Sequence, residues 1–120
     1  MATVLVVDDA AFMRMMLTDL LKEAGHQVIG EAGTGNEAVQ LYATLKPALV
    51  TMDLVMPEKS GLDALQEILA FDSAARVIMV TAVGQQETAE AALRLGARAY
   101  LVKPFQPSQV RACIADVLAS

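Results

Sequence analysis

Residues Val4–Ala10 read VLVVDDA: four apolar residues lead directly into two adjacent carboxylates, Asp8 and Asp9. A short, continuous apolar run is typical of a strand that is covered on both faces, as in a parallel sheet. Two acids side by side repel each other, by about 1 kcal/mol for charges ~4 Å apart in water and by about 4 kcal/mol at an effective dielectric constant of 20. The stretch therefore predicts a buried strand that ends at a site for a cation.

Similar apolar runs recur along the chain, and helical patterns separate them. Apolar residues recur at three- and four-residue spacing after each run, as they do from Met13 to Ala24, which predicts five helices. Short loops and right-handed crossovers then place helices on both faces of the sheet. The predicted fold class is α/β, a doubly wound five-stranded parallel sheet with five helices. We expect its strands at Thr3–Val7, Gln27–Ala32, Ala48–Asp53, Arg76–Thr81 and Arg98–Val102.

Polar residues at the expected helix starts support this assignment. Thr34 and Glu37 have the spacing of a capping box, in which each side chain satisfies the other residue's free backbone N–H. Ser60 is expected to cap the third helix, and Pro107 suits the first turn of the fifth. His26 follows a turn glycine, has no evident partner and is interpreted as a surface residue.

Length, charge and cysteine content limit the class of protein. A chain of 120 residues has the commonest size of one domain, so we expect a single domain over residues 1–120. A net charge of −5 without a basic stripe argues against direct nucleic-acid binding. The single cysteine, Cys113, fits a reducing compartment, and no apolar run approaches the ~20 residues of a membrane span. With no signal-peptide pattern either, we expect a cytoplasmic protein without membrane contact.

Polar residues gather at the carboxyl ends of the predicted strands. Asp8 and Asp9 follow the first strand, Asp53 ends the third, Thr81 ends the fourth and Lys103 follows the fifth. Ligands of open α/β sheets bind outside these ends, where the strand order reverses. A cluster of carboxylates without nearby His or Cys favours Mg²⁺ or Mn²⁺ over Zn²⁺. The sequence therefore predicts a divalent-cation site at this edge.

The same residues have the chemistry that phosphoryl transfer requires. Such a transfer needs an in-line nucleophile and neutralisation of the three equatorial oxygens. Asp53 can act as the nucleophile and form an aspartyl phosphate. The metal, the Lys103 ammonium and the Thr81 hydroxyl with nearby backbone N–H groups would then each meet one oxygen.

Four segments of the chain, VVDDA, VTMDLVMPEKSG, VTAVG and AYLVKPF, occur in the order and at the spacing of a response-regulator receiver domain. The chain resembles that family from about Thr3 to Leu118. DDAAFMRMML, GQQ and KPFQPS are further similar to its CheY-like chemotaxis branch. The resemblance implies the strand order 2-1-3-4-5, for which the flavodoxin and CheY proteins are the known examples.

The resemblance also implies a role for each site residue. Asp53 would accept a phosphoryl group from a phosphohistidine on a sensor histidine kinase. Asp8, Asp9, Asp53 and the backbone carbonyl of Val55 would hold Mg²⁺. Thr81 and Lys103 would bind the phosphoryl oxygens.

Further features of the family concern its conformational switch and the lifetime of the phosphate. Tyr100 would be the switch aromatic, turning inward as the threonine moves, and the Lys103–Pro104 peptide bond is expected to be cis. The positions of Val55 and Val83 tune phosphate lifetime in the family. Because both side chains are apolar here, we expect slow intrinsic hydrolysis and dependence on a phosphatase.

The resemblance implies that output comes from protein docking. The output face would be the fourth helix, fifth strand and fifth helix, and a flagellar motor switch protein is the family's usual target. Helix 1 would meet the kinase, with the exposed-side Met15 as a contact. We expect a monomer with no effector domain, and no enzyme activity beyond its own phosphoryl uptake and hydrolysis.

Several alternatives remain at this stage. Within the family, the chain could be a phosphorelay intermediate or a receiver domain excised from a transcriptional regulator. Outside it, a flavodoxin-like cofactor binder would need a Ser/Thr/Gly-rich loop where DDAAFMR stands, and a haloacid-dehalogenase-type hydrolase would need a D-x-D arrangement after the first strand. Asp8 and Asp9 could also simply cap the first helix, and Tyr100 could be ordinary sheet packing.

Overall fold

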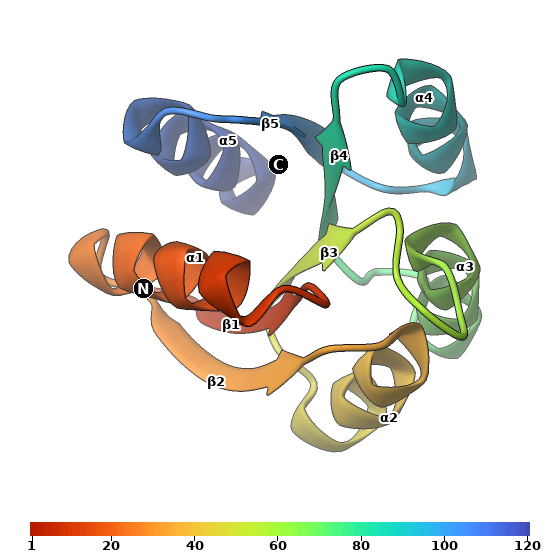
Figure 1. Ribbon diagram of the computed structural model, residues 1–120. Coiled ribbons are helices and arrows are strands. Elements are labelled where there is room, and N and C mark those ends of the chain that lie inside the picture. The colour runs from red at the N-terminus through yellow and green to blue at the C-terminus, as the bar shows by residue number, and fades with distance from the viewer.

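Strands and helices alternate along the chain, five of each. The structure is a computed structural model and describes residues 1–120 (Figure 1). The strands are β1 (Thr3–Val7), β2 (Gln27–Ala32), β3 (Leu49–Asp53), β4 (Val77–Ala82) and β5 (Ala99–Lys103). The helices are α1 (Ala11–Glu23), α2 (Gly35–Leu45), α3 (Gly61–Phe71), α4 (Gln86–Leu95) and α5 (Pro107–Ala119).

The strands form one parallel sheet in the order β2-β1-β3-β4-β5. Helices α1 and α5 cover one face, and α2, α3 and α4 cover the other (Figure 1). The predicted fold class and strand order are therefore confirmed. None of the helices has the length and apolar character needed to span a bilayer.

Three of the five strands differ from the prediction by one residue. Ala48 lies before β3, because its N–H donates to the Thr3 hydroxyl at 2.9 Å instead of joining the sheet. β4 and β5 both start and end one residue later than expected, and their last residues, Ala82 and Lys103, pair with each other. This pairing brings Lys103 into the sheet and fixes where its side chain starts.

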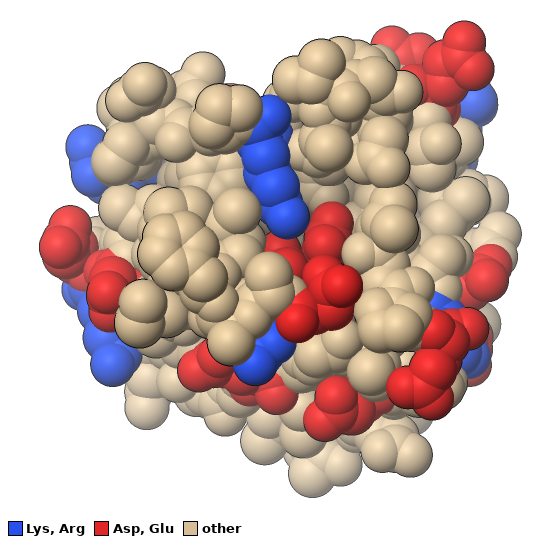
Figure 2. Space-filling model, in the orientation of Figure 1, with Lys and Arg blue, Asp and Glu red and all other residues tan.

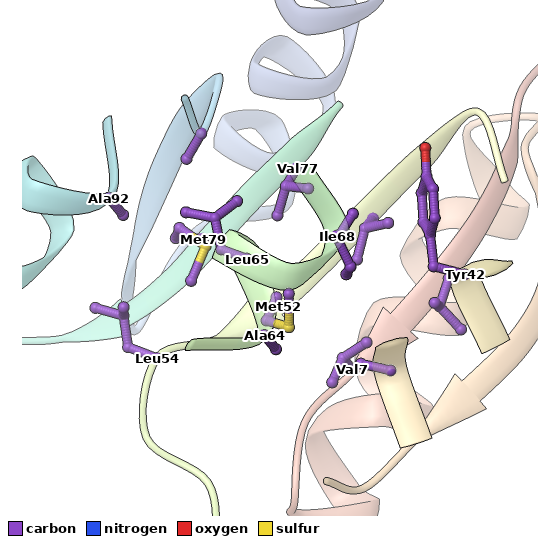
Figure 3. Packing of buried hydrophobic residues seen from close by; sticks show 14 of the residues in the cluster. Val7, Tyr42, Met52, Leu54, Ala64, Leu65, Ile68, Val77, Met79 and Ala92 are labelled. Atoms are coloured by element: carbon purple, nitrogen blue, oxygen red, sulfur yellow. The ribbon is translucent and has the colours of Figure 1, made fainter. Parts of the chain in front are cut away.

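Both faces of the central strands are buried, as the continuous apolar runs predict. On one face, Leu5, Met52 and Met79 belong to a cluster that α2, α3 and α4 cover. Figure 3 shows Met52 and Met79 packed beside Leu65 of α3. On the other face, strand residues of β1, β3 and β4 pack against α1 and α5. The sheet is therefore held from both sides.

The helix caps follow the prediction with one correction. The Thr34 hydroxyl accepts a hydrogen bond from the Glu37 N–H at 3.1 Å, as expected, and Ser60 accepts one from the Asp63 N–H at 3.2 Å. The return bond of the predicted capping box is wrong, because the Glu37 carboxylate accepts from the Gly33 N–H at 3.2 Å and not from the Thr34 N–H.

Candidate functional site

The carboxyl edge of the sheet brings the predicted site residues together. Asp53 ends β3 beside Val80 of β4, and Lys103 ends β5. Carboxylate oxygens of Asp8, Asp9 and Asp53 all lie within 4.8 Å of one another. Figure 2 shows acidic side chains gathered in a hollow of this face, with a basic side chain reaching down to them. The acidic cluster that the sequence predicts is therefore present in the fold.

Asp8 is held in place at every polar atom. It is 1% exposed, and its N–H donates to the Ala32 carbonyl at 3.0 Å. One carboxylate oxygen accepts from the Ala10 N–H at 2.9 Å, and the other accepts from Lys103 Nζ at 3.1 Å. The helix-capping interpretation of this acid is wrong, since the N–H that Asp8 satisfies belongs to Ala10, the residue before α1, and α1 has no side-chain cap hydrogen bond. The second oxygen faces the cluster.

Asp9 differs from its neighbour in that it is exposed and its carboxylate makes no hydrogen bond or ion pair. No protein contact fixes the direction of this side chain. A carboxylate without a protein partner, within 4.8 Å of two others, is free to bind a cation.

Asp53 lies at the centre of the cluster and is only 8% exposed. The pKa of its carboxyl group is raised from 3.8 to about 6, chiefly by burial and next by the negative charge of Asp8. Lys103, whose Nζ lies 3.7 Å from an Asp53 carboxylate oxygen, and a hydrogen bond from the Val55 backbone both oppose this rise. The charge of Lys103 therefore does not offset the effects of burial and of the negative charge of Asp8 on Asp53. One lysine beside three acids leaves the cluster with too little positive charge.

The raised pKa of Asp53 predicts a pH-dependent stability of the metal-free protein. Between about pH 4 and pH 6 the folded chain holds a proton that the unfolded chain has released, so stability falls as pH rises through 6. The shift from 3.8 to about 6 corresponds to about 3 kcal/mol. Urea unfolding in EDTA measures the free energy of unfolding. From pH 4 to pH 7, that of Asp53→Asn should rise relative to that of the wild type by about 3 kcal/mol. A constant difference between the two proteins across that range would contradict the assignment.

The donor set fits a hard divalent cation. All three side chains offer carboxylate oxygens, which Mg²⁺ prefers, and no His or Cys belongs to the cluster. Asp8 and Asp9 both raise the pKa of Asp53, in addition to the larger effect of burial, and such a cation would neutralise their charge. The site is consistent with the predicted magnesium centre.

Thr81 and Tyr100 lie where the strand positions place them, and neither contacts Asp53. Thr81 is fully buried, and its hydroxyl lies 3.3 Å from the Ala82 carbonyl oxygen and 3.4 Å from the Gln85 side-chain oxygen. Tyr100 is half-buried and packs against the cluster beneath α2, α3 and α4. The switch roles of both residues stay predictions. The Lys103–Pro104 peptide bond is cis, as expected.

Two contacts near the site were not foreseen from the sequence. The Arg14 side chain of α1 donates to the Asp8 carbonyl oxygen at 2.6 Å and pairs with Glu31 of β2 at 3.2 Å. A single arginine within the apolar FMRMML run was the only sequence signal for it.

The interpretation of His26 as a residue without a partner was wrong, because its Nδ1 accepts a hydrogen bond from the Ala2 N–H at 3.1 Å.

An apolar groove borders the acidic cluster. It has a volume of about 460 Å³ and runs between the start of α1 and the segment after β5. Phe12 at its rim is 69% exposed, and Met15 of the same helix is 56% exposed. Its lining residues are Phe12, Met13, Met16, Lys103, Pro104 and Phe105. An apolar surface of this kind beside a polar site is typical of a protein-docking surface.

Comparison with known proteins assigns the class to which this fold and site belong. Residues 4–115 match the family described as response regulator receiver domain, and the chain belongs to that family. It is 54% identical over 107 residues to the chemotaxis protein CheY of Thermotoga maritima, covering 89% of each chain. It is 48% identical to the CheY of Bacillus subtilis, covering 96% of each.

A solved structure supports the same assignment. The chain superposes on a chain of the CheX–CheY–BeF₃–Mg²⁺ complex from Borrelia burgdorferi with a TM-score of 0.94 and 34% identity. The match covers 98% of this chain and 90% of that one. The predicted resemblance to receiver domains, with CheY-like chemotaxis relatives, is therefore confirmed.

Proposed function

We propose that this chain is a two-component response regulator that accepts a phosphoryl group on Asp53 and signals by phosphorylation-dependent docking in chemotaxis. The observation that carries the proposal is the meeting of three carboxylates and Lys103 at one edge of the sheet. The relatives named as chemotaxis proteins support the chemotaxis role. The phosphoryl donor would be a phosphohistidine of a sensor histidine kinase.

The proposed reaction uses groups that the site already holds. A carboxylate oxygen of Asp53 attacks the phosphorus, and the bond from phosphorus to the donor's nitrogen breaks with its electron pair on the donor. The Lys103 ammonium, 3.7 Å from Asp53, would bind one phosphoryl oxygen. The Thr81 hydroxyl would bind another after turning away from Gln85. The chain would thus catalyse only its own phosphoryl uptake and hydrolysis, and would not act on other substrates.

Magnesium would be held by Asp8, Asp9, Asp53 and the backbone carbonyl of Val55. When bound, it would neutralise the acids and the charge of the phosphoryl oxygens. Without a cation, the negative charge of Asp8 and Asp9 opposes the approach of a phosphoryl donor.

Two surfaces would carry the protein partners. The apolar groove beside Lys103 would receive the kinase's phosphotransfer surface, since it places a docked partner next to Asp53. The face of α4, β5 and α5 would bind the output target, which we propose is a flagellar motor switch protein. We further propose a phosphatase partner; the CheX–CheY complex from Borrelia burgdorferi supports binding of a second protein by a chain of this fold.

The function can be tested with a small phosphodonor. We expect acetyl phosphate to add one phosphoryl group to the wild-type protein in the presence of Mg²⁺ and none in EDTA, as measured by intact-protein mass spectrometry. The labelled and unlabelled forms would then be compared in pull-downs from a motile organism's lysate. Equal labelling with and without divalent cation would refute the proposed chemistry.

Removing the free carboxylate tests the metal site. Asp9→Ala should weaken Mg²⁺ binding by about 10-fold or more, because a direct oxygen ligand is lost while no protein contact is broken. Calorimetric titration gives the dissociation constant. Asp19→Ala, which removes an exposed acid of α1 far along the helix, is the control and should leave it unchanged. Unchanged affinity in Asp9→Ala would count against a ligand role.

The lifetime of the phosphorylated state follows from two exposed valines. Val55 is 59% exposed and Val83 is 73% exposed, and neither side chain can hydrogen-bond an attacking water. We expect slow loss of phosphate after the donor is removed, and faster loss in Val55→Asn. Loss within seconds in the wild type, followed by mass spectrometry, would contradict this.

A second candidate function is supported by another relative. The transcriptional regulatory protein PdtaR of Mycobacterium tuberculosis is 46% identical over 107 residues, which are 52% of its length. This chain could therefore be the receiver part of a longer regulator. Sequencing the natural gene beyond the codon for Ser120 would decide between the two, because an open reading frame that continues into a second domain favours the regulator.

A further inference from the structure

The Arg14 side chain ties three elements together beside the acidic cluster. It lies in the first turn of α1, where its Nη1 donates to the carbonyl oxygen of Asp8 at 2.6 Å. Its Nε donates to a carboxylate oxygen of Glu31, on β2, at 3.2 Å. A guanidinium can make both contacts at once because its donors form a rigid, planar fork. Arg14 therefore joins the end of β1 to both α1 and β2.

The carbonyl that Arg14 holds belongs to the peptide group between Asp8 and Asp9. Because a peptide group is planar, fixing this oxygen also fixes the N–H and the Cα of Asp9. The Asp9 carboxylate makes no protein contact of its own, so this peptide group is the part of the structure that fixes where the Asp9 side chain starts, and its rotamers extend from that point. By contrast, Asp8 is held independently through Ala32, Ala10 and Lys103.

The charge of Arg14 does not explain the contact. The guanidinium is already paired with Glu31, and it is not among the charges that shift the pKa of Asp53. A free positive charge here would moreover oppose cation binding. The contribution of Arg14 to the site is therefore geometric.

We infer that Arg14 is a positioning residue for the metal site: it orients the Asp8–Asp9 peptide group and so aims the Asp9 carboxylate at the cation. This inference rests on the proposed function, in which the cluster of Asp8, Asp9 and Asp53 binds Mg²⁺. Glu31 acts through Arg14 by holding the guanidinium in place and balancing its charge.

The test removes the contacts of Arg14 with the Asp8 carbonyl and with Glu31 without changing the net charge. The double variant Arg14→Met/Glu31→Gln loses one positive and one negative charge together. A matched control is Lys59→Met/Glu67→Gln, which deletes an ion pair of the same exposure between the segment before α3 and α3 itself. The side chains are 22% and 47% exposed in the first pair and 23% and 47% exposed in the control pair. Mg²⁺ binding is measured by calorimetry, and stability by urea unfolding in EDTA.

We expect Mg²⁺ to bind about 10-fold more weakly to the Arg14/Glu31 variant and equally well to the control. The rate of acetyl phosphate labelling should fall at limiting Mg²⁺ and recover at saturating Mg²⁺. A purely structural role would instead lower stability in EDTA and leave the Mg²⁺ dissociation constant unchanged. If the double variant does not fold, Arg14→Lys, which keeps the charge but loses the fork, is expected to show the same weaker binding.

The outcomes separate this inference from the proposed function. A wild-type protein that does not bind Mg²⁺ would overturn both. Wild-type binding with equal affinity in the Arg14/Glu31 variant, or in Arg14→Lys if that variant is needed, would overturn the positioning role alone.

Discussion

Asp53→Asn is expected to abolish phosphoryl uptake from acetyl phosphate while leaving the fold intact. The amide has nearly the same shape as the carboxylate, but it lacks the charged oxygen that attacks phosphorus. Asp53 is 8% exposed and lies between the other two acids and Lys103, whereas Asp8 and Asp9 are assigned to the metal. We expect labelling, measured by intact-protein mass spectrometry in saturating Mg²⁺, to fall below detection.

The control for this change is Asp19→Asn, which neutralises an exposed acid of α1 and should label at the wild-type rate. Thermal unfolding of both variants in EDTA would verify that the fold is retained. Labelling of Asp53→Asn at the wild-type rate would refute the assignment of Asp53 as the phosphoacceptor.

Gly61→Ala is expected to destabilise the protein by about 3 kcal/mol, the upper end of the usual cost of overpacking. A Cβ at position 61 would lie 2.0 Å from the backbone carbonyl oxygen of Asp53 and 2.9 Å from the Cα of Leu54. The Gly61 N–H also donates to the Leu54 carbonyl at 2.8 Å, so the two segments cannot separate without losing this bond. Alanine is the better helix former by about 1 kcal/mol, so any loss comes from the clash.

Gly33→Ala provides a control without a clash. A Cβ there would meet only the ends of the Arg14 and Glu37 side chains, at 3.5 and 3.7 Å, which is ordinary contact. Urea unfolding should place this variant close to the wild type. A loss below about 1 kcal/mol in Gly61→Ala would mean that α3 can move away from the end of β3, contrary to the packing described.

Gly61 also connects stability with the site. It begins α3 and lies directly against the backbone of the residue proposed to be phosphorylated. A shift of α3 would therefore move Asp53 relative to Asp8 and Lys103. We expect Gly61→Ala to slow labelling as well as to lower stability.

The fold could be predicted because the physical signals in the sequence agree with each other. Strands buried on both faces need continuous apolar runs, and β1, β3 and β4 have them. The helices between them show three- and four-residue apolar spacing. The strand order came only from the family resemblance, because apolar periodicity does not determine which strands are neighbours. The one-residue errors at β3, β4 and β5 arose where single backbone bonds decide the boundary.

The gathering of the site residues could be predicted because parallel strands bring their carboxyl ends to one edge. Asp8, Asp53 and Lys103 are placed by this rule alone. Arg14 was missed because its contacts depend on a long side chain reaching a backbone carbonyl in another element. The direction of the Thr81 hydroxyl toward Gln85 was missed for the same reason, since strand position does not determine a side-chain rotamer.

The most direct test of the central claim is chemical mapping of the phosphorylated residue. Borohydride reduction converts an aspartyl phosphate to homoserine, which peptide mass spectrometry locates in the chain. After treatment with acetyl phosphate and Mg²⁺, we predict homoserine at position 53, and none in protein treated in EDTA. Homoserine at position 8 or 9, or at no position in protein that binds Mg²⁺, would contradict the account.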